Sequence, residues 1–324
     1  MKKALKNIVK VLLVIFAALI VFVIGLTIYN KVMLKKEAAV FDNPLGQHVE
    51  VDGHNMTVYV EGEGEHTLVF LSGSGTACPI LDFKALYSLL SDDYRIVVIE
   101  KFGYGFSDVV DGDRDFDTIL RQDREALSIL GIEGPFILCP HSMSGVEALL
   151  WAQKFPDEVE AIAGLDMAVP EHYDIIDGSS GSGTGLNMLV DMLRGSGLLR
   201  LLGDDFIIPC AEHLTEDEIR IYRQIVYARI LNENVINEGE WTDEVCDEIR
   251  SNTIPDIPII LFISDGTGGT GLDTETWRGC TYDFAESRDN VEIVELNCGH
   301  YVHDFESERI SADMREFIES LTHL

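Results

Sequence analysis

Apolar runs that are typical of buried strands alternate with helical segments along most of this chain. We predict strands at 67–71, 94–100, 135–139, 159–165, 258–263 and 291–296, and helices at 79–90, 115–130, from 146 onward and at 306–321. Strands that alternate with helices predict an α/β fold with a mostly parallel sheet. A hairpin pattern around Asp52 and Gly53, with strands at 48–51 and 56–61, precedes the alternation.

The first 36 residues differ in kind from the rest. Val11 to Tyr29 carries no charge, with four lysines before it and three after it. About 20 apolar residues at 1.5 Å each span roughly 30 Å, the thickness of bilayer hydrocarbon. A cleaved secretory signal has a shorter apolar run of about 7–15 residues that ends at a small-residue site. We therefore predict an uncleaved single-pass membrane anchor over residues 1–36, and the excess of lysines before it favours an extracytoplasmic position for the large domain.

Beyond residue 40 the chain is strongly acidic. The first 40 residues hold seven lysines and one glutamate, which leaves 17 basic and 55 acidic residues, a net charge of −38. Such a surface repels phosphate backbones, so we expect no nucleic-acid partner. The acidic surface is sufficiently explained by its effect of keeping the domain soluble.

Six cysteines are spread over the domain without the spacing of a metal site. They are typical of reduced or buried thiols rather than of a disulfide framework, which small domains need more. We predict neither a metal nor a cofactor.

The strand at 135–139 leads through a sharp turn into a helix, and Ser142 lies in that turn. A hydroxyl there stands clear of the sheet, at the amino end of a helix whose free N–H groups favour negative charge. Ser142 is therefore a candidate nucleophile, although a serine before a helix is also an ordinary N-cap.

Candidate partners for Ser142 follow other strands at the same predicted edge of the sheet. His300 comes directly after the last strand, Asp166 ends the strand at 159–165, and Asp265 follows the strand at 258–263. A serine needs a neutral imidazole to take its proton, and the imidazole needs a carboxylate to fix its tautomer. We favour Asp166 as the acid and keep Asp265 as the alternative.

These motifs resemble those of the α/β-hydrolase superfamily over residues 45–322. The turn P-H-S-M-S-G is similar to the G-x-S-x-G nucleophile elbow, with Pro140 and Ser144 at the glycine positions. The stretch after Glu100, K-F-G-Y-G-F-S-D, resembles a loop that these hydrolases place beside the site. The G-L-D-M-A-V-P stretch around Asp166 resembles the acid-bearing segment of pancreatic-type lipases.

The resemblance implies the roles of further residues. Ser72 stands where the family has the histidine of its His-Gly loop, so the backbone N–H groups of Ser74 and Met143 are the expected oxyanion donors. The chain order Ser142, acid, His300 is that of the family. His303 is expected at the surface or in support of the site.

The same resemblance implies an α/β-hydrolase core over residues 41–170 and 256–324. Residues 171–255 interrupt the alternation and are expected to form a helical cap, entered through a glycine-serine hinge at 178–185. Two apolar helices are predicted within the cap, at 186–202 and 216–231.

The predicted function is a membrane-anchored serine hydrolase, resembling a carboxylesterase or lipase, which cleaves a small or lipid-derived acyl substrate. A serine nucleophile disfavours dehalogenase and epoxide hydrolase chemistry. A peptidase that resembles proline iminopeptidases is the alternative enzyme. The missing elbow glycines keep open a ligand-binding protein without turnover.

Overall fold

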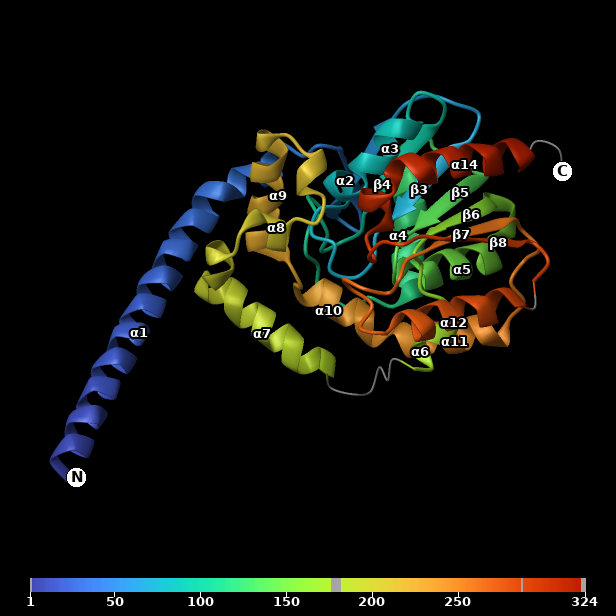
Figure 1. Cartoon of the computed structure of the whole chain (residues 1–324). Helices are drawn as coiled ribbons and strands as arrows, with labels where there is room; N and C mark the ends of the chain where they lie inside the picture. The colour runs from blue at the N-terminus through green and yellow to red at the C-terminus, as the bar shows by residue number, and fades with distance from the viewer. Residues whose placement is uncertain (1, 176–181, 287, 322–324) are drawn as a thin grey trace.

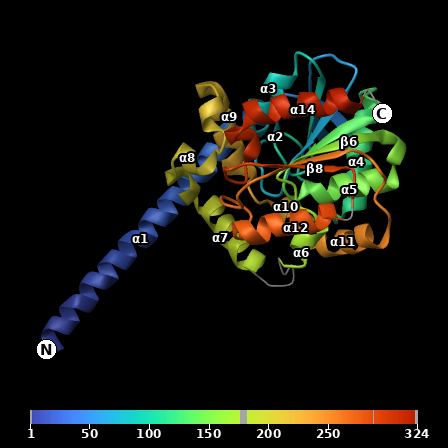
Figure 2. The ribbon, with the colours of Figure 1, turned by 45° about the vertical axis from the view of Figure 1, so that its right-hand side comes forward.

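The computed structural model describes residues 2–175, 182–286 and 288–321. A long helix, α1 (Lys2–Glu37), stands away as a rod from a rounded domain that holds the other elements (Figures 1 and 2). In the described part of the chain, this is the one helix long and apolar enough to cross a membrane, with a mean hydropathy of 3.2 over an 18-residue stretch. A membrane anchor and a signal sequence both have these properties.

An eight-stranded sheet forms the centre of the domain, in the order β1-β2-β4-β3-β5-β6-β7-β8. Its strands are β1 (Gln47–Val51), β2 (His54–Glu61), β3 (Thr67–Leu71), β4 (Arg95–Glu100), β5 (Phe136–Pro140), β6 (Val159–Leu165), β7 (Ile259–Ile263) and β8 (Val291–Glu295). Strand β2 pairs antiparallel with β1 and with β4. Every further pair across the sheet, from β4 to β8, is parallel. The predicted α/β fold with a mostly parallel sheet is confirmed.

Helices cover both faces of this sheet. One face packs against α4 (Phe116–Ile129), α5 (Ser144–Lys154) and α11 (Thr242–Ser251). The other packs against α3 (Lys84–Leu90) and α14 (Ser307–Leu321). The helix predicted at 79–90 is divided at Phe83, which ends α2 (Pro79–Asp82) and precedes α3.

The segment between β6 and β7 is helical. It contains α6 (Pro170–Tyr173), α7 (Ser182–Ser196), η3 (Leu198–Leu201), α8 (Asp204–Ile207), η4 (Ala211–His213), α9 (Glu216–Arg229), α10 (Glu233–Glu240) and α11. Residues 178–181 of the predicted hinge lie outside the described residues, and α7 begins within the remainder of that stretch. Of these helices, α11 returns to pack on α5, so it covers the sheet rather than the predicted site.

Buried polar contacts fasten this helical segment to the core. Asn232 donates to the Gly103 carbonyl oxygen at 2.6 Å, and the Asn234 amide exchanges two hydrogen bonds with the Val110 backbone. Lys101, which is 1% exposed, forms ion pairs with Glu147 of α5 and Glu238 of α10. The loop after β4 is thus the main polar junction between core and insertion.

Candidate active site

Ser142 occupies a strained turn between β5 and α5. Its φ of 55° lies in the left-handed region, which non-glycine residues seldom adopt. Gly73 lies against it so closely that a Cβ there would stand 2.5 Å from the Ser142 Cβ. The turn therefore holds the hydroxyl at the carboxyl ends of the strands, beside the loop that follows β3.

Ser144 and Gly145 explain how the turn forms without the usual glycines. The buried Ser144 hydroxyl lies 2.7 Å from the Leu71 carbonyl oxygen and accepts a hydrogen bond from the His141 N–H at 3.0 Å. The backbone passes closest to a neighbouring segment at the residue after Ser144. A Cβ on Gly145 would stand 2.1 Å from the Ala168 carbonyl oxygen. Glycine is thus required at 145, while position 144 has room for a hydroxyl that bonds the turn.

His300 connects Ser142 to Asp166. The Ser142 Oγ lies 2.9 Å from His300 Nε2, and Asp166 Oδ2 lies 2.6 Å from His300 Nδ1. With Nδ1 protonated toward the carboxylate, Nε2 is left as an acceptor for the serine proton. The sequence separations are large, and the carboxyl ends of β5, β6 and β8 bring the three side chains together.

Asp166 is fully buried and held by donors on every side. Its carboxylate accepts hydrogen bonds from the Ser264 N–H (2.7 Å), the Ser264 hydroxyl (2.6 Å) and the Trp277 indole N–H (2.8 Å). These bonds fix the direction in which the carboxylate faces His300. The sequence analysis identified neither Ser264, which follows β7 beside β6, nor Trp277, whose role depends on the packing of α12 (Thr274–Glu286).

The alternative acid, Asp265, faces elsewhere. Its carboxylate accepts from the N–H and the hydroxyl of Thr267, at 2.9 and 2.5 Å. These bonds lower the pKa of Asp265, and no described contact joins it to His300. Of the two candidate acids, the structure therefore brings Asp166 to the imidazole and leaves Asp265 to cap its own turn.

The two expected oxyanion donors flank Ser142. Met143 follows it at the start of α5, and Ser74 belongs to the loop that packs on it through Gly73. Neither backbone N–H has an acceptor among the described residues. Free N–H groups beside a nucleophile are what an oxyanion hole requires. Ser72, in place of the family histidine, buries a hydroxyl that has no described partner.

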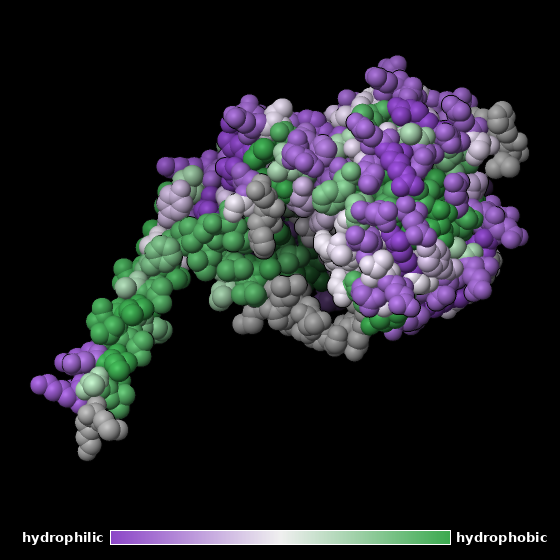
Figure 3. Space-filling view, viewed as in Figure 1, coloured by the Kyte–Doolittle hydropathy of each residue, from purple (hydrophilic) through white to green (hydrophobic). Residues whose placement is uncertain are grey.

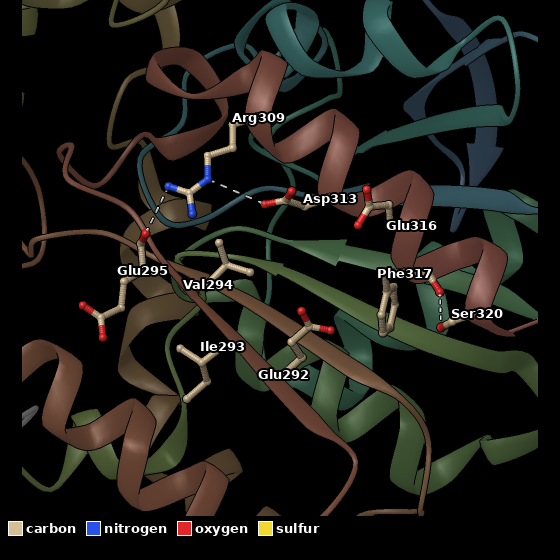
Figure 4. A pocket seen from close by; sticks show the side chains of 9 residues that line it. All are labelled: Glu292, Ile293, Val294, Glu295, Arg309, Asp313, Glu316, Phe317 and Ser320. Atoms are coloured by element: carbon tan, nitrogen blue, oxygen red, sulfur yellow. Dashed lines mark hydrogen bonds and ion pairs between the residues drawn. The ribbon is translucent and has the colours of Figure 1, made fainter.

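A hollow of about 560 Å³ opens against His300. Its walls come from the turn at Thr267, from Phe305 after the histidine, and from Ile208 and Glu212 of the helical insertion. This volume is within the range of small-molecule pockets. Another hollow, of about 640 Å³, lies along β8 and α14 (Figure 4). It is lined by acidic side chains such as Glu292 and Glu316 and includes none of Ser142, His300 and Asp166.

Behind His300 lies a buried group of rings and carboxylates that the sequence analysis missed. His303 is fully buried, so it does not lie at the surface, and its ring is 4.7 Å from that of His141. The His141 ring lies 4.6 Å from that of His300, and burial keeps the pKa of His141 well below its usual value. His141 is therefore neutral near neutral pH and adds no charge beside the candidate base.

One group of side chains in the described part of the chain is close enough together to hold a metal ion. It consists of Asp82, His303 and Asp304, with one ligand atom of each within 4.8 Å of the others. His303 Nε2 lies 3.2 Å from Asp82 Oδ2, while both Asp304 carboxylate oxygens lack a described partner. A proton on Asp304 also reduces the negative charge of the two buried carboxylates, since burial and the nearby Asp82 raise the pKa of Asp304 to about 9. The adjacent His303 and Asp304 were the sequence signal for this cluster.

Solved structures of similar fold are α/β-hydrolase-fold proteins. A thermophilic esterase from Thermogutta terrifontis has a TM-score of 0.63 and 18% identity, with 85% of this chain and 99% of that chain covered. A mutant epoxide hydrolase from Bacillus megaterium has a TM-score of 0.65 and 17% identity, with coverage of 84% and 100%. A haloalkane dehalogenase loop variant from Bradyrhizobium elkanii has a TM-score of 0.60 and 17% identity, with coverage of 86% and 97%. The chain therefore has the α/β-hydrolase fold, as the sequence predicted.

The sequence also matches a curated protein over nearly its whole length. It is 34% identical over 335 residues to YbdG of Bacillus subtilis (strain 168), an uncharacterized protein, with 98% of this chain and 99% of that protein covered. The chain belongs to the YbdG family. No model of a known protein family matches it.

Proposed function

We propose that this protein is a membrane-anchored serine hydrolase that cleaves the acyl bond of carboxylic esters. The observation that carries the proposal is the continuous chain of contacts from Ser142 Oγ through His300 to Asp166, with separations of 2.9 and 2.6 Å. Solved structures of this fold include an esterase, an epoxide hydrolase and a haloalkane dehalogenase. A serine hydroxyl at the elbow favours acyl transfer among these chemistries.

The mechanism follows from the geometry. Ser142 Oγ attacks the carbonyl carbon of the ester while His300 Nε2 takes the hydroxyl proton. The negative oxygen of the tetrahedral intermediate is stabilised by the N–H groups of Met143 and Ser74. His300 returns its proton to the departing alcohol, which leaves an acyl group on Ser142. His300 then takes a proton from water as the water oxygen attacks the acyl carbon. The bond between the acyl carbon and Ser142 Oγ breaks, His300 returns the proton to Oγ, and the acid is released.

The contacts of α1 support an uncleaved anchor over a removed signal. Asn30 is 1% exposed, and its side-chain amide donates to the Arg194 carbonyl oxygen (2.9 Å) and accepts from Arg200 (2.6 Å). Arg200 also forms a bidentate ion pair with Glu37, at 2.6 and 2.9 Å. Removal of α1 would leave Arg200 without these partners, so the end of this helix is part of the folded domain.

A fluorophosphonate probe tests the enzyme assignment. We expect labelling of the native protein and none of Ser142→Ala, with His300→Ala strongly reduced. Equal labelling of native protein and Ser142→Ala would remove the basis for catalysis and favour a ligand-binding protein. Panels of p-nitrophenyl esters and aminoacyl anilides then separate esterase from peptidase, and preference for the anilides would overturn the ester assignment.

A further inference from the structure

The helix α1 contacts the helical insertion near the carboxyl end of its uncharged run. Gly197, which follows α7, approaches α1 so closely that a Cβ there would lie 2.7 Å from the Asn30 Cβ and 3.3 Å from the Leu26 carbonyl oxygen. Leu26 and Asn30 mark the last turn of the uncharged run that begins at Val11. If that run crosses a bilayer, the carboxyl end of α7 lies at the membrane surface.

Apolar side chains are exposed on the insertion beside this junction. Leu189 and Met192 of α7 are 46% and 57% exposed, and Leu201 of η3 is 59% exposed. Positions i and i+3 share one face of a helix, so Leu189 and Met192 point the same way. Figure 3 shows the hydrophobic surface of α1 continuing onto the adjoining part of the insertion. We call Leu189, Met192 and Leu201 the apolar edge.

We propose that the apolar edge rests on the same bilayer that α1 crosses, so that the hollow beside His300 takes ester substrates whose acyl tails lie in the membrane. This inference rests on the proposed function and names its substrate class. An apolar helix face at the level of a membrane surface inserts into the headgroup and acyl boundary. The strongly acidic domain is not held there by charge, so the contact depends on apolar burial.

The insertion links the apolar edge to the hollow. Ile208 and Glu212, which line the hollow, follow Leu201 closely along the chain through α8. Phe305, which also lines the hollow, is 56% exposed. Apolar side chains therefore lie both on the apolar edge and in the hollow beside His300. An acyl tail can pass along such a surface without full exposure to water.

Spin labels on the full-length protein in phosphatidylcholine nanodiscs test the contact directly. Met192→Cys and Leu201→Cys carry the label, and Leu89→Cys is the matched control because it is also exposed, on α3, which Figures 1 and 2 place across the domain from α7. We expect labels at 192 and 201 to be relaxed by oxygen more than by a water-soluble nickel complex, with the reverse at 89. Equal nickel accessibility at all three positions would overturn the proposal. Dipolar broadening between labels on two chains would instead assign this edge to a second copy.

An activity measurement tests the substrate class. The double variant Met192→Glu with Leu201→Glu is expected to hydrolyse a long-chain ester held in phosphatidylcholine vesicles at least tenfold more slowly than native protein, and a soluble short-chain ester at an unchanged rate. Equal rates on both substrates would contradict membrane delivery. Because the spin-label result does not require catalysis, failure of the proposed enzyme activity would be seen separately, as no turnover of either ester.

Discussion

His300 Nδ1 and Asp166 Oδ2 lie 2.6 Å apart in the interior of the protein, although 134 residues separate them in sequence. Every other described contact of the Asp166 carboxylate comes from a fixed donor on Ser264 or Trp277. The carboxylate is thus held facing Nδ1 of His300 by donors from two other segments of the chain.

Asp166→Asn is expected to lower kcat by about 10⁴, the loss found when a triad aspartate becomes an amide and the histidine adopts the wrong tautomer. Asp265→Asn is the control and is expected to change kcat less than about threefold, because its carboxylate bonds Thr267. The measurement is kcat/KM on a soluble p-nitrophenyl ester. A larger loss with Asp265→Asn would exchange the roles of the two acids.

Ser144→Ala is expected to lower the free energy of unfolding by about 0.5–1.5 kcal/mol, since the Leu71 carbonyl and the His141 N–H would lose the serine hydroxyl but keep their bond to each other. Ser311→Ala is the control, because the one described partner of that buried hydroxyl is the Glu308 carbonyl of its own helix. Urea denaturation measures both variants. Equal stability of the two variants would show that the Ser144 hydroxyl does not hold the elbow.

Lys101→Met is expected to destabilise the protein by about 3–5 kcal/mol, because it leaves the carboxylates of Glu147 and Glu238 buried without their cation. Lys154→Met removes a more exposed pair with Glu248 and should cost less than about 1 kcal/mol. Adding Glu238→Gln to Lys101→Met should restore part of the loss. No recovery in the double variant would mean that the lysine acts through packing alone.

The buried Asp304 predicts a pH dependence of stability. Its pKa is raised from the usual 3.8 to about 9, chiefly by burial and then by Asp82. The folded state therefore holds this proton more tightly than the unfolded state, so its stabilising effect is complete below about pH 4 and is lost as the pH rises toward 9. Asp304→Asn should gain stability relative to native protein between pH 5 and 9. The urea midpoint at each pH measures this difference.

Local patterns predicted much of this molecule. All eight strands were found in the sequence, because apolar runs between turns are strong signals and burial on both faces of the sheet requires them. Ser142, His300 and Asp166 were predicted together because each follows a strand that ends at the same edge of the sheet, and the structure brings the three side chains into contact. The choice between Asp166 and Asp265 stayed open, since it depends on the direction of a carboxylate that Ser264 and Trp277 determine.

Other features depend on tertiary contacts that no local pattern reports. Helices α10 and α11 were missed because their apolar positions are few, and the contacts of Asn234 and Cys246 with the core define their place. His303 is buried because α13 (Val302–Phe305) turns it toward His141. Glycine is required at position 145 rather than at position 144 for a similar reason, because the Ala168 carbonyl lies against Gly145.

The clamp between Asn30 and Arg200 gives the proposed anchor a mechanical role. A membrane helix changes its tilt when the bilayer becomes thicker or thinner. Because α1 continues without a break through Asn30 to Glu37, and both residues bind Arg200, a change of tilt in a bilayer would act directly on Arg200 of the helical insertion. If α1 spans a membrane, the thickness of that membrane would then be felt in the insertion that lines the hollow beside His300.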